Sequence, residues 1–247
     1  MHTFRQHASC LGISGDFSVM SNVLGFSRRA LPPDPSGAEV SVSMREQITA
    51  IEGRHVHLNV IRVGFDAIAA SNIGASIERV DWAILRIRQI YAQASLGVGR
   101  VLHWQILQAD ADGADDIGSE DEADELWSSW DVPNDGIDVF MARTMSTSDF
   151  IGLSPVDGAC DKDSKDDGLF GGPINRSADG VARTFAHEIG HYLGLSHNHG
   201  DNCPTAVSAR NRLMAQTRCA VSLRDSTDLT NSERSTMRGH CIVKGGC

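Results

Sequence analysis

The stretch FAHEIGHYLGLSHNHGD, from Phe185 to Asp201, constrains the fold of this chain more than any other segment. Its first half continues an amphipathic pattern that predicts a helix from about Val181 to Leu193. Ser177 or Asp179 can cap the start of this helix, and Gly194 suits the left-handed residue that follows a helix end. Four histidines and one glutamate therefore lie on this helix or shortly after it.

The spacing of these residues indicates a metal site. His187 and His191 are four residues apart, so a helix places both imidazoles on one face, within reach of one ion. Gly194 lets the chain turn, and three residues later His197 can return as a third nitrogen ligand. Three neutral protein ligands leave a position open for water, as a catalytic zinc requires. Glu188 is placed to take the proton of a zinc-bound water.

Two histidines on a helix can also serve only in packing, and H-E-x-x-H by itself occurs by chance. The longer pattern, with Gly194 and His197 at fixed spacing, favours zinc hydrolase chemistry over that alternative. His199 lies two residues beyond the pattern, so we expect it not to bind the metal.

Earlier segments predict a mixed order of strands and helices. Runs rich in Val and Ile predict strands, and one run with apolar residues at helical spacing predicts a helix. The order is strand, helix, strand, loop, strand, loop and then the histidine helix. The segments before that helix are HVHLNVIRVGF from His55, SIERVDWAILRIRQIYAQAS from Ser76, GRVLHWQILQ from Gly99, GIDVFMART from Gly136 and GGPINR from Gly171.

Two acidic segments interrupt this order and are expected to be loops. DADGADDIGSEDEADE runs from Asp110 to Glu125, and DKDSKDDG runs from Asp161 to Gly168. Carboxylates next to glycine can bind Ca²⁺, although neither segment matches a complete EF-hand loop. A solvated acidic loop without calcium is the favoured reading of both.

Composition narrows the partners and the compartment. The net charge of −10 argues against nucleic acid, and no apolar run approaches the roughly 18 residues that span a bilayer. No signal peptide is recognisable at the start, so a removed signal, another export route and an intracellular location all fit. Disulfides in a secreted protein are favoured over reduced thiols in a cytoplasmic one. The cysteines are Cys10, Cys160, Cys203, Cys219, Cys241 and Cys247.

The segment HEIGHYLGLSH, followed by NRLMAQ, resembles the metzincin clan of zinc metallopeptidases. The resemblance implies a single zinc ion held by His187, His191 and His197, with Glu188 as the general base. It also implies that Met214 is the residue of the Met-turn, which lies beneath the metal without binding it.

Within the clan, the sequence is most similar to the pappalysin-like branch. The similarity rests on Cys203, Asn211, Met214, Cys219 and the segment DLTNSERSTMRGH. It implies a disulfide between Cys203 and Cys219 that would hold the loop after the third ligand. Several metzincin branches have a tyrosine two residues after the methionine, where this chain has Gln216, so the group that stabilises the tetrahedral intermediate is unassigned.

The resemblance implies an α/β (α+β) fold with a twisted, mostly parallel, five-stranded sheet and two long helices. A small irregular C-terminal subdomain would contain one helix. The catalytic domain would span residues 46–247, with subdomains of about 46–196 and 197–247. Substrate would add to the edge strand, for which GIDVFMART and GLSPVDG are the candidates.

Residues 1–45 would form an N-terminal extension or prosegment. Cys10 could keep the enzyme latent by binding the zinc, although pairing with Cys160 or a free tail are alternatives. The expected function is a zinc-dependent endopeptidase that acts on proteins or peptides. A zinc-containing toxin or recognition module and a zinc amidohydrolase with a non-peptide substrate are the alternatives. Arg210 or Arg212 could favour acidic substrate side chains.

Overall fold

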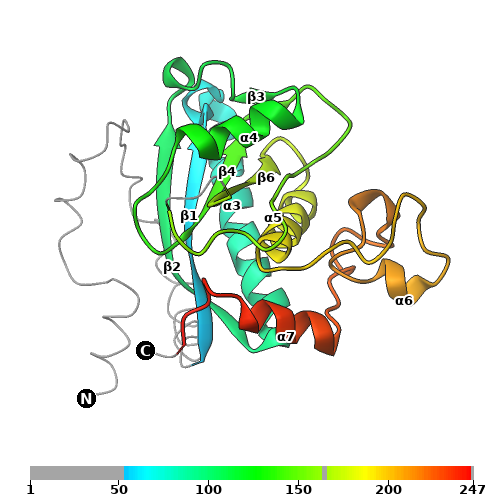
Figure 1. Ribbon diagram of the computed structural model, residues 1–247. Coiled ribbons are helices and arrows are strands. Elements are labelled where there is room, and N and C mark those ends of the chain that lie inside the picture. Colours follow the sequence, from blue (N-terminus) through cyan, green and yellow to red (C-terminus); the bar gives the residue numbers. More distant parts are fainter. Residues whose placement is uncertain (1–52, 163–165, 246–247) are drawn as a thin grey trace.

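The protein is described by a computed structural model that covers residues 53–162 and 166–245 (Figure 1). A four-stranded parallel sheet, in the order β2-β1-β4-β6, lies at its centre. The strands are β1 (Arg54–Val63), β2 (Leu96–Ile106), β4 (Ile137–Ala142) and β6 (Gly168–Pro173). The mixed α/β fold with a mostly parallel sheet, expected from the sequence, is confirmed.

The described residues form four strands in this sheet, and the expected fifth is reduced to a single bridge. Leu153 and Phe170 exchange two backbone hydrogen bonds of 3.0 and 2.8 Å in antiparallel orientation. Pro155 follows two residues later and has no N–H to donate, so the pairing cannot continue as a regular strand. A separate two-stranded sheet joins β3 (Asp116–Ile117) to β5 (Thr144–Met145).

Two long helices cover one face of the central sheet. They are α3 (Ala70–Tyr91) and α5 (Ala178–Tyr192), and their apolar faces pack on β1 and β4 in the larger of two cores. The hydroxyl of Tyr91 donates to the carbonyl of Ala186 at 2.8 Å, which ties the two helices together. The histidine helix is therefore held against both the sheet and its neighbouring helix.

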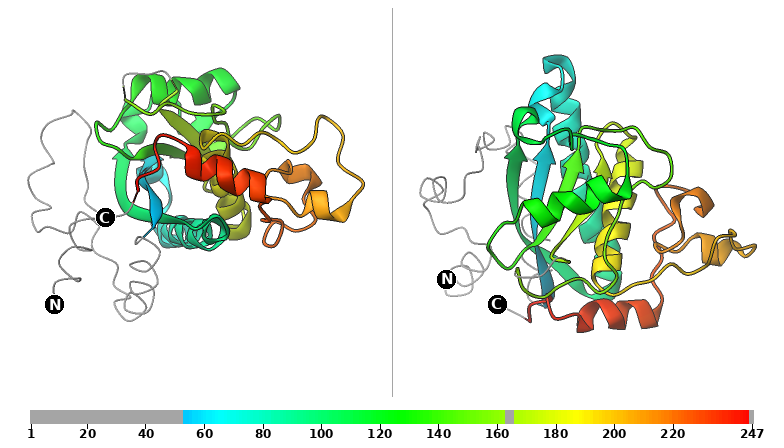
Figure 2. Two further views of the ribbon diagram at one scale, coloured as in Figure 1. Left: turned by 60° about the horizontal axis from the view of Figure 1, so that its bottom comes forward. Right: turned by 45° about the horizontal axis from the view of Figure 1, so that its top comes forward.

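A shorter helix, α4 (Glu120–Ser129), covers the opposite face of the sheet, as Figure 2 shows. This helix corrects the expectation of a loop from Asp110 to Glu125. Ser119 accepts a hydrogen bond from the backbone of Glu122, so it caps the helix. Acidic residues favour the first turn of a helix because they complement its dipole, which explains the run of carboxylates.

The chain after α5 has few regular elements. It forms α6 (Val207–Arg210), a 3-10 turn η5 (Thr217–Cys219) and α7 (Asn231–Gly239). Further 3-10 turns are η2 (Phe65–Ala67), η3 (Ala92–Ala94) and η4 (Gln108–Asp110). Thr230 and Glu233 form a capping box at the start of α7. The final described residues return to β1, where Lys244 and His55 exchange hydrogen bonds.

Within residues 53–162 and 166–245, no helix has the length and apolar character needed to cross a membrane. The expected N-terminal extension, its boundary at residue 45 and Cys10 lie outside the described residues.

Candidate metal centre

The start and the end of α5 determine where its histidines lie. Of the two candidate caps, Ser177 accepts the hydrogen bond from Gly180, whereas Asp179 accepts one from the indole of Trp82. At the other end, Gly194 has φ of +90°, a conformation that side chains with a Cβ rarely adopt. The chain turns there and runs back along the helix toward its histidines.

This turn brings three imidazoles together. The Nε2 atoms of His187, His191 and His197 are 3.1 to 3.2 Å from one another. Nδ1 of His187 is 2.8 Å from the carbonyl of Leu213, and Nδ1 of His191 is 2.6 Å from that of Leu195. Because carbonyls accept hydrogen bonds, these two Nδ1 atoms carry the protons, and their Nε2 lone pairs face the centre of the group.

The donor set fits a zinc ion. Three nitrogens around zinc at the usual bond length of about 2.0–2.1 Å lie about 3.3 Å apart in tetrahedral geometry, close to the separations here. Lone pairs that face one another cannot satisfy each other, so the group favours a cation between them. Burial lowers the pKa of His187 well below its ordinary value and that of His191 to about 4, which keeps both rings neutral.

Glu188 lies beside this group and is 6% exposed. Burial raises its pKa to about 8, against the attraction of the Arg183 guanidinium, which lowers it. Gly152 covers the carboxylate so closely that a Cβ at that position would lie 2.7 Å from its Oε1. The segment around Gly152 is therefore in direct contact with the expected general base.

Met214 lies in a turn beside the histidine helix. A Cβ at Gly190 would lie 3.0 Å from the Met214 sulfur, so this glycine makes room for the thioether. The backbone N–H of Asn198 donates to the carbonyl of Met214 at 3.2 Å, which joins the turn to the segment of His197. The sequence alone assigned no role to Gly190.

His199 lies outside the group of three histidines. Its Nδ1 contacts the carbonyl of Gly200 at 2.7 Å, and its Nε2 accepts from the backbone of Gln216 at 3.1 Å. Both of its nitrogens are occupied, so the ring braces the chain just after the Met214 turn.

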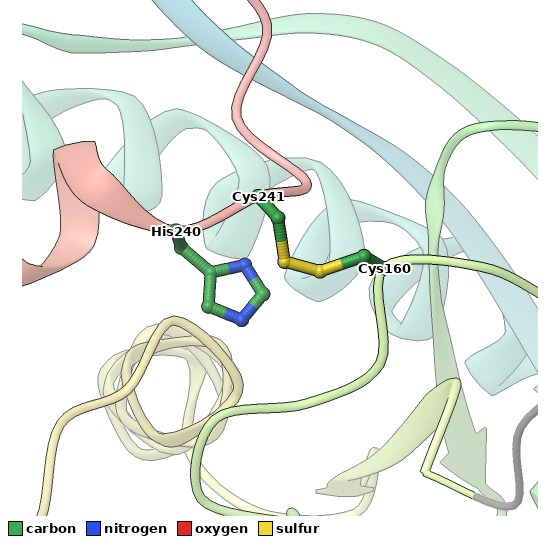
Figure 3. A group of neighbouring side chains, drawn as sticks. All are labelled: Cys160, His240 and Cys241. Atoms are coloured by element: carbon green, nitrogen blue, oxygen red, sulfur yellow. A yellow bond between two sulfur atoms is a disulfide. The ribbon is translucent and has the colours of Figure 1, made fainter.

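Cys203 and Cys219 form a disulfide between the loop after His197 and the chain after Met214. Cys160 and Cys241 form a second, so the alternative pairing of Cys160 with Cys10 is wrong. Figure 3 shows His240 beside this second bridge. These three side chains lie close enough to bind a metal, but a disulfide has no thiolates to offer.

The described residues of the two acidic segments give no support for bound calcium. Apart from the two groups containing histidine, no three potential ligand side chains converge among residues 53–162 and 166–245. In the first segment, Asp115 is buried and pairs with Arg143 at 2.6 Å. An arginine neutralises this carboxylate without any metal.

Two expectations about substrate contacts are changed by the structure. GIDVFMART contains β4, which lies between β1 and β6 and is therefore not an edge strand of the central sheet. Arg212 pairs with Glu233 and Arg210 donates to the carbonyl of Cys219, so both guanidinium groups already have partners.

The sequence placed Gly152 in the candidate edge segment GLSPVDG without indicating its contact with Glu188, and it gave no role to Arg183. Only tertiary contacts show that Gly152 faces Glu188. Arg183 could have been noticed, because it is a charged residue one turn before His187 on the same helix face.

Comparisons with known proteins found several solved structures and one family model that are similar to this chain. No curated protein matches it. A solved chaperone–substrate complex matches with 11% identity and a TM-score of 0.44, over 76% of this chain and 34% of that one. An archaemetzincin from Methanopyrus kandleri matches with 13% identity and a TM-score of 0.43, over 74% and 94%. Metalloproteinase-II from Bacteroides fragilis matches with 12% identity and a TM-score of 0.47, over 76% and 53%. This chain thus spans less than two thirds of the first and third.

The family model of the reprolysin-like metallo-peptidases of family M12B matches residues 72–198, more than half of the 247 residues. The matched region runs from α3 through the histidine helix and includes His187, His191 and His197. The match supports a metzincin-type zinc peptidase without supporting the pappalysin-like branch specifically. The chain therefore belongs to the reprolysin-like metallo-peptidases of family M12B.

Proposed function

We propose that this protein is a zinc-dependent endopeptidase that hydrolyses peptide bonds in proteins or peptides. His187, His191 and His197 would hold the ion, and Glu188 would act as the general base. The observation that carries the proposal is the convergence of three Nε2 atoms beside a buried carboxylate. Family membership supports it, because a metallo-peptidase requires a metal and acts on peptide bonds.

In the proposed reaction, the metal, Glu188 and the carbonyls that orient the histidines would have different roles. A bound zinc ion supplies a Lewis acid that lowers the pKa of water and polarises a carbonyl. Glu188 would accept the proton of the attacking water and deliver it to the leaving amine. The carbonyls of Leu213 and Leu195 keep His187 and His191 in the tautomer that presents Nε2.

The substrate would bind along residues 152–154. Leu153 faces Phe170 with both of its backbone groups. In an antiparallel pair, neighbouring residues point their backbone groups the other way, so those of Gly152 and Ser154 are turned away from β6. An extended peptide that paired with them would pass beside Glu188, which Gly152 contacts.

Cleavage of a peptide library by wild type, Glu188→Ala and chelator-treated protein tests the proposal. We expect Glu188→Ala to retain zinc and to lose about 10²–10⁴-fold in kcat, because a general base contributes about that much. His197→Ala should lose the zinc. Equal cleavage by wild type and Glu188→Ala would refute the assigned mechanism, and unaltered zinc content in His197→Ala would refute the third ligand.

The two disulfides of the described residues suit an oxidising, extracellular compartment, and we propose that the protein is secreted.

We propose residues 46–247 as the catalytic domain and Cys10 in the preceding segment as a latency ligand. If the Cys10 thiol blocks the metal, Cys10→Ser raises the activity of the full chain, and no increase would reject this role.

A further inference from the structure

Arg183 is a buried arginine on the helix that carries the histidines. Its side chain is 1% exposed, and it lies one turn before His187. A buried charge is costly unless hydrogen bonds compensate it. The acceptors of its guanidinium are all uncharged oxygens: the carbonyl of Ser226 at 3.1 Å, the hydroxyl of Thr217 at 3.1 Å and the carbonyls of Leu213 at 3.0 Å, Arg212 at 3.4 Å and Ala215.

Four of these five acceptors belong to residues 212–217, the segment that contains Met214. Leu213 precedes the methionine and Ala215 follows it, and the same guanidinium nitrogen, Nη2, donates to both carbonyls. The planar fork of an arginine can serve several acceptors in fixed directions, which a lysine cannot do. Arg183 therefore fastens both sides of the turn to α5.

The same turn contacts two of the three histidine segments. The carbonyl of Leu213 accepts from Arg183 and also from Nδ1 of His187 at 2.8 Å. The carbonyl of Met214 accepts from the N–H of Asn198, the residue after His197. A displacement of the turn would therefore rotate one imidazole and move the segment of another.

We infer that Arg183 is a positioning residue for the metal centre: it fixes the turn from Leu213 to Ala215, and the turn orients His187 and holds the segment of His197. This inference rests on the proposed zinc ligands. Groups that orient metal ligands typically change metal affinity or activity by about 10–100-fold when they are removed.

Arg62 provides a matched control. It is also a fully buried arginine, 2% exposed, but it lies on β1 and contacts the carbonyl of Trp104. This hydrogen bond leads to β2, and within residues 53–162 and 166–245 Arg62 makes no hydrogen bond to the histidine helix or the Met214 turn. Loss of Arg62 thus reports what the removal of any buried guanidinium does to the fold.

The experiment compares Arg183→Lys and Arg183→Gln with Arg62→Lys and Arg62→Gln in the full chain. Circular dichroism identifies the folded variants, a colorimetric chelator measures the rate of zinc release, and the visible spectrum of the cobalt-substituted protein reports ligand geometry. We expect zinc release at least about 10-fold faster and a shifted cobalt spectrum for the Arg183 variants. The Arg62 variants should keep both wild-type values.

Wild-type zinc release and cobalt spectra in a folded Arg183 variant would overturn the inference. If neither Arg183 variant folds, Thr217→Val tests the inference instead, because it removes one acceptor of the Arg183 guanidinium with little change in volume. It should release zinc a few-fold faster, since one hydrogen bond contributes about 1 kcal/mol, and an unaltered rate would also overturn the inference. If wild type binds no zinc, or His187→Ala retains it, the proposed function itself fails.

Discussion

At the scale of single residues, the space in front of Glu188 is set by a glycine from a distant part of the chain. A Cβ at Gly152 would lie 2.6 to 2.8 Å from three atoms of the glutamate side chain, closer than real contacts allow. We therefore predict that Gly152→Ala displaces the carboxylate. A misplacement of about 1 Å can cost about 10²-fold in rate, so kcat should fall by at least about 10-fold.

Measurement of kcat and zinc content on the same preparation checks this prediction. The zinc content should stay at the wild-type value, because the three atoms nearest to the added Cβ all belong to Glu188, which is not a proposed zinc ligand. Gly200→Ala is the control, since a Cβ there would meet nothing within 4 Å. Wild-type kcat in Gly152→Ala would show that the carboxylate tolerates the extra methyl group.

At the scale of an element, β1 carries a buried histidine that makes the fold sensitive to acid. Nδ1 of His57 accepts a hydrogen bond from the backbone of Arg100 at 3.0 Å, which requires a neutral ring. Burial lowers the pKa of His57 from 6.5 to about 4, the charge of Arg100 adds to the shift, and Asp135 opposes it.

The sign of the effect follows from proton binding. Between pH 6.5 and about 4, the unfolded chain binds a proton at this histidine and the folded chain does not, so the free energy of unfolding falls as the pH falls. At pH 5 the loss relative to pH 7.5 should be on the order of 2 kcal/mol.

Denaturant unfolding at pH 7.5 and pH 5, with a chelator present, measures this loss in wild type and in His57→Asn. Asparagine keeps an acceptor near the position of Nδ1 and does not titrate, so the variant should lose less stability. Equal losses in the two proteins would mean that His57 contributes nothing to the acid sensitivity.

At the scale of the whole molecule, the two disulfides close loops of different length and have different consequences. Cys160–Cys241 spans 81 residues and joins the segment before β6 to the chain after α7. Cys203–Cys219 spans 16 residues around the Met214 turn. The chain-entropy relation gives about 4.5 kcal/mol for the longer loop and about 3 kcal/mol for the shorter one.

We predict that the two double variants, in which both cysteines of one pair are replaced with serine, differ in which property they lose: one loses more folding stability and the other releases zinc faster. Loss of Cys160–Cys241 should lower the free energy of unfolding more. Loss of Cys203–Cys219 should accelerate zinc release more, since this pair encloses the Met214 turn, which contacts His187 and the residue after His197. Thermal unfolding and chelator kinetics on both double variants measure the two effects. The reverse order in zinc release would contradict the role of the shorter loop.

The sequence by itself determined the features that depend on neighbouring residues. The period of apolar residues predicted α3 and α5, and the spacing of His187, His191 and His197 around Gly194 predicted that one ion could contact all three. The structure brings these three together because a helix followed by a tight turn leaves little freedom over so short a distance.

Tertiary structure alone decided which distant segments meet. Gly152 faces Glu188, Arg183 fastens the Met214 turn, Cys160 pairs with Cys241, and β4 is an inner strand. The acidic run that begins α4 was mistaken for a loop because charged residues are common both in loops and at helix starts. Such contacts depend on how sheet, helices and loops pack, and residues far apart in the chain have no fixed spacing that could predict them.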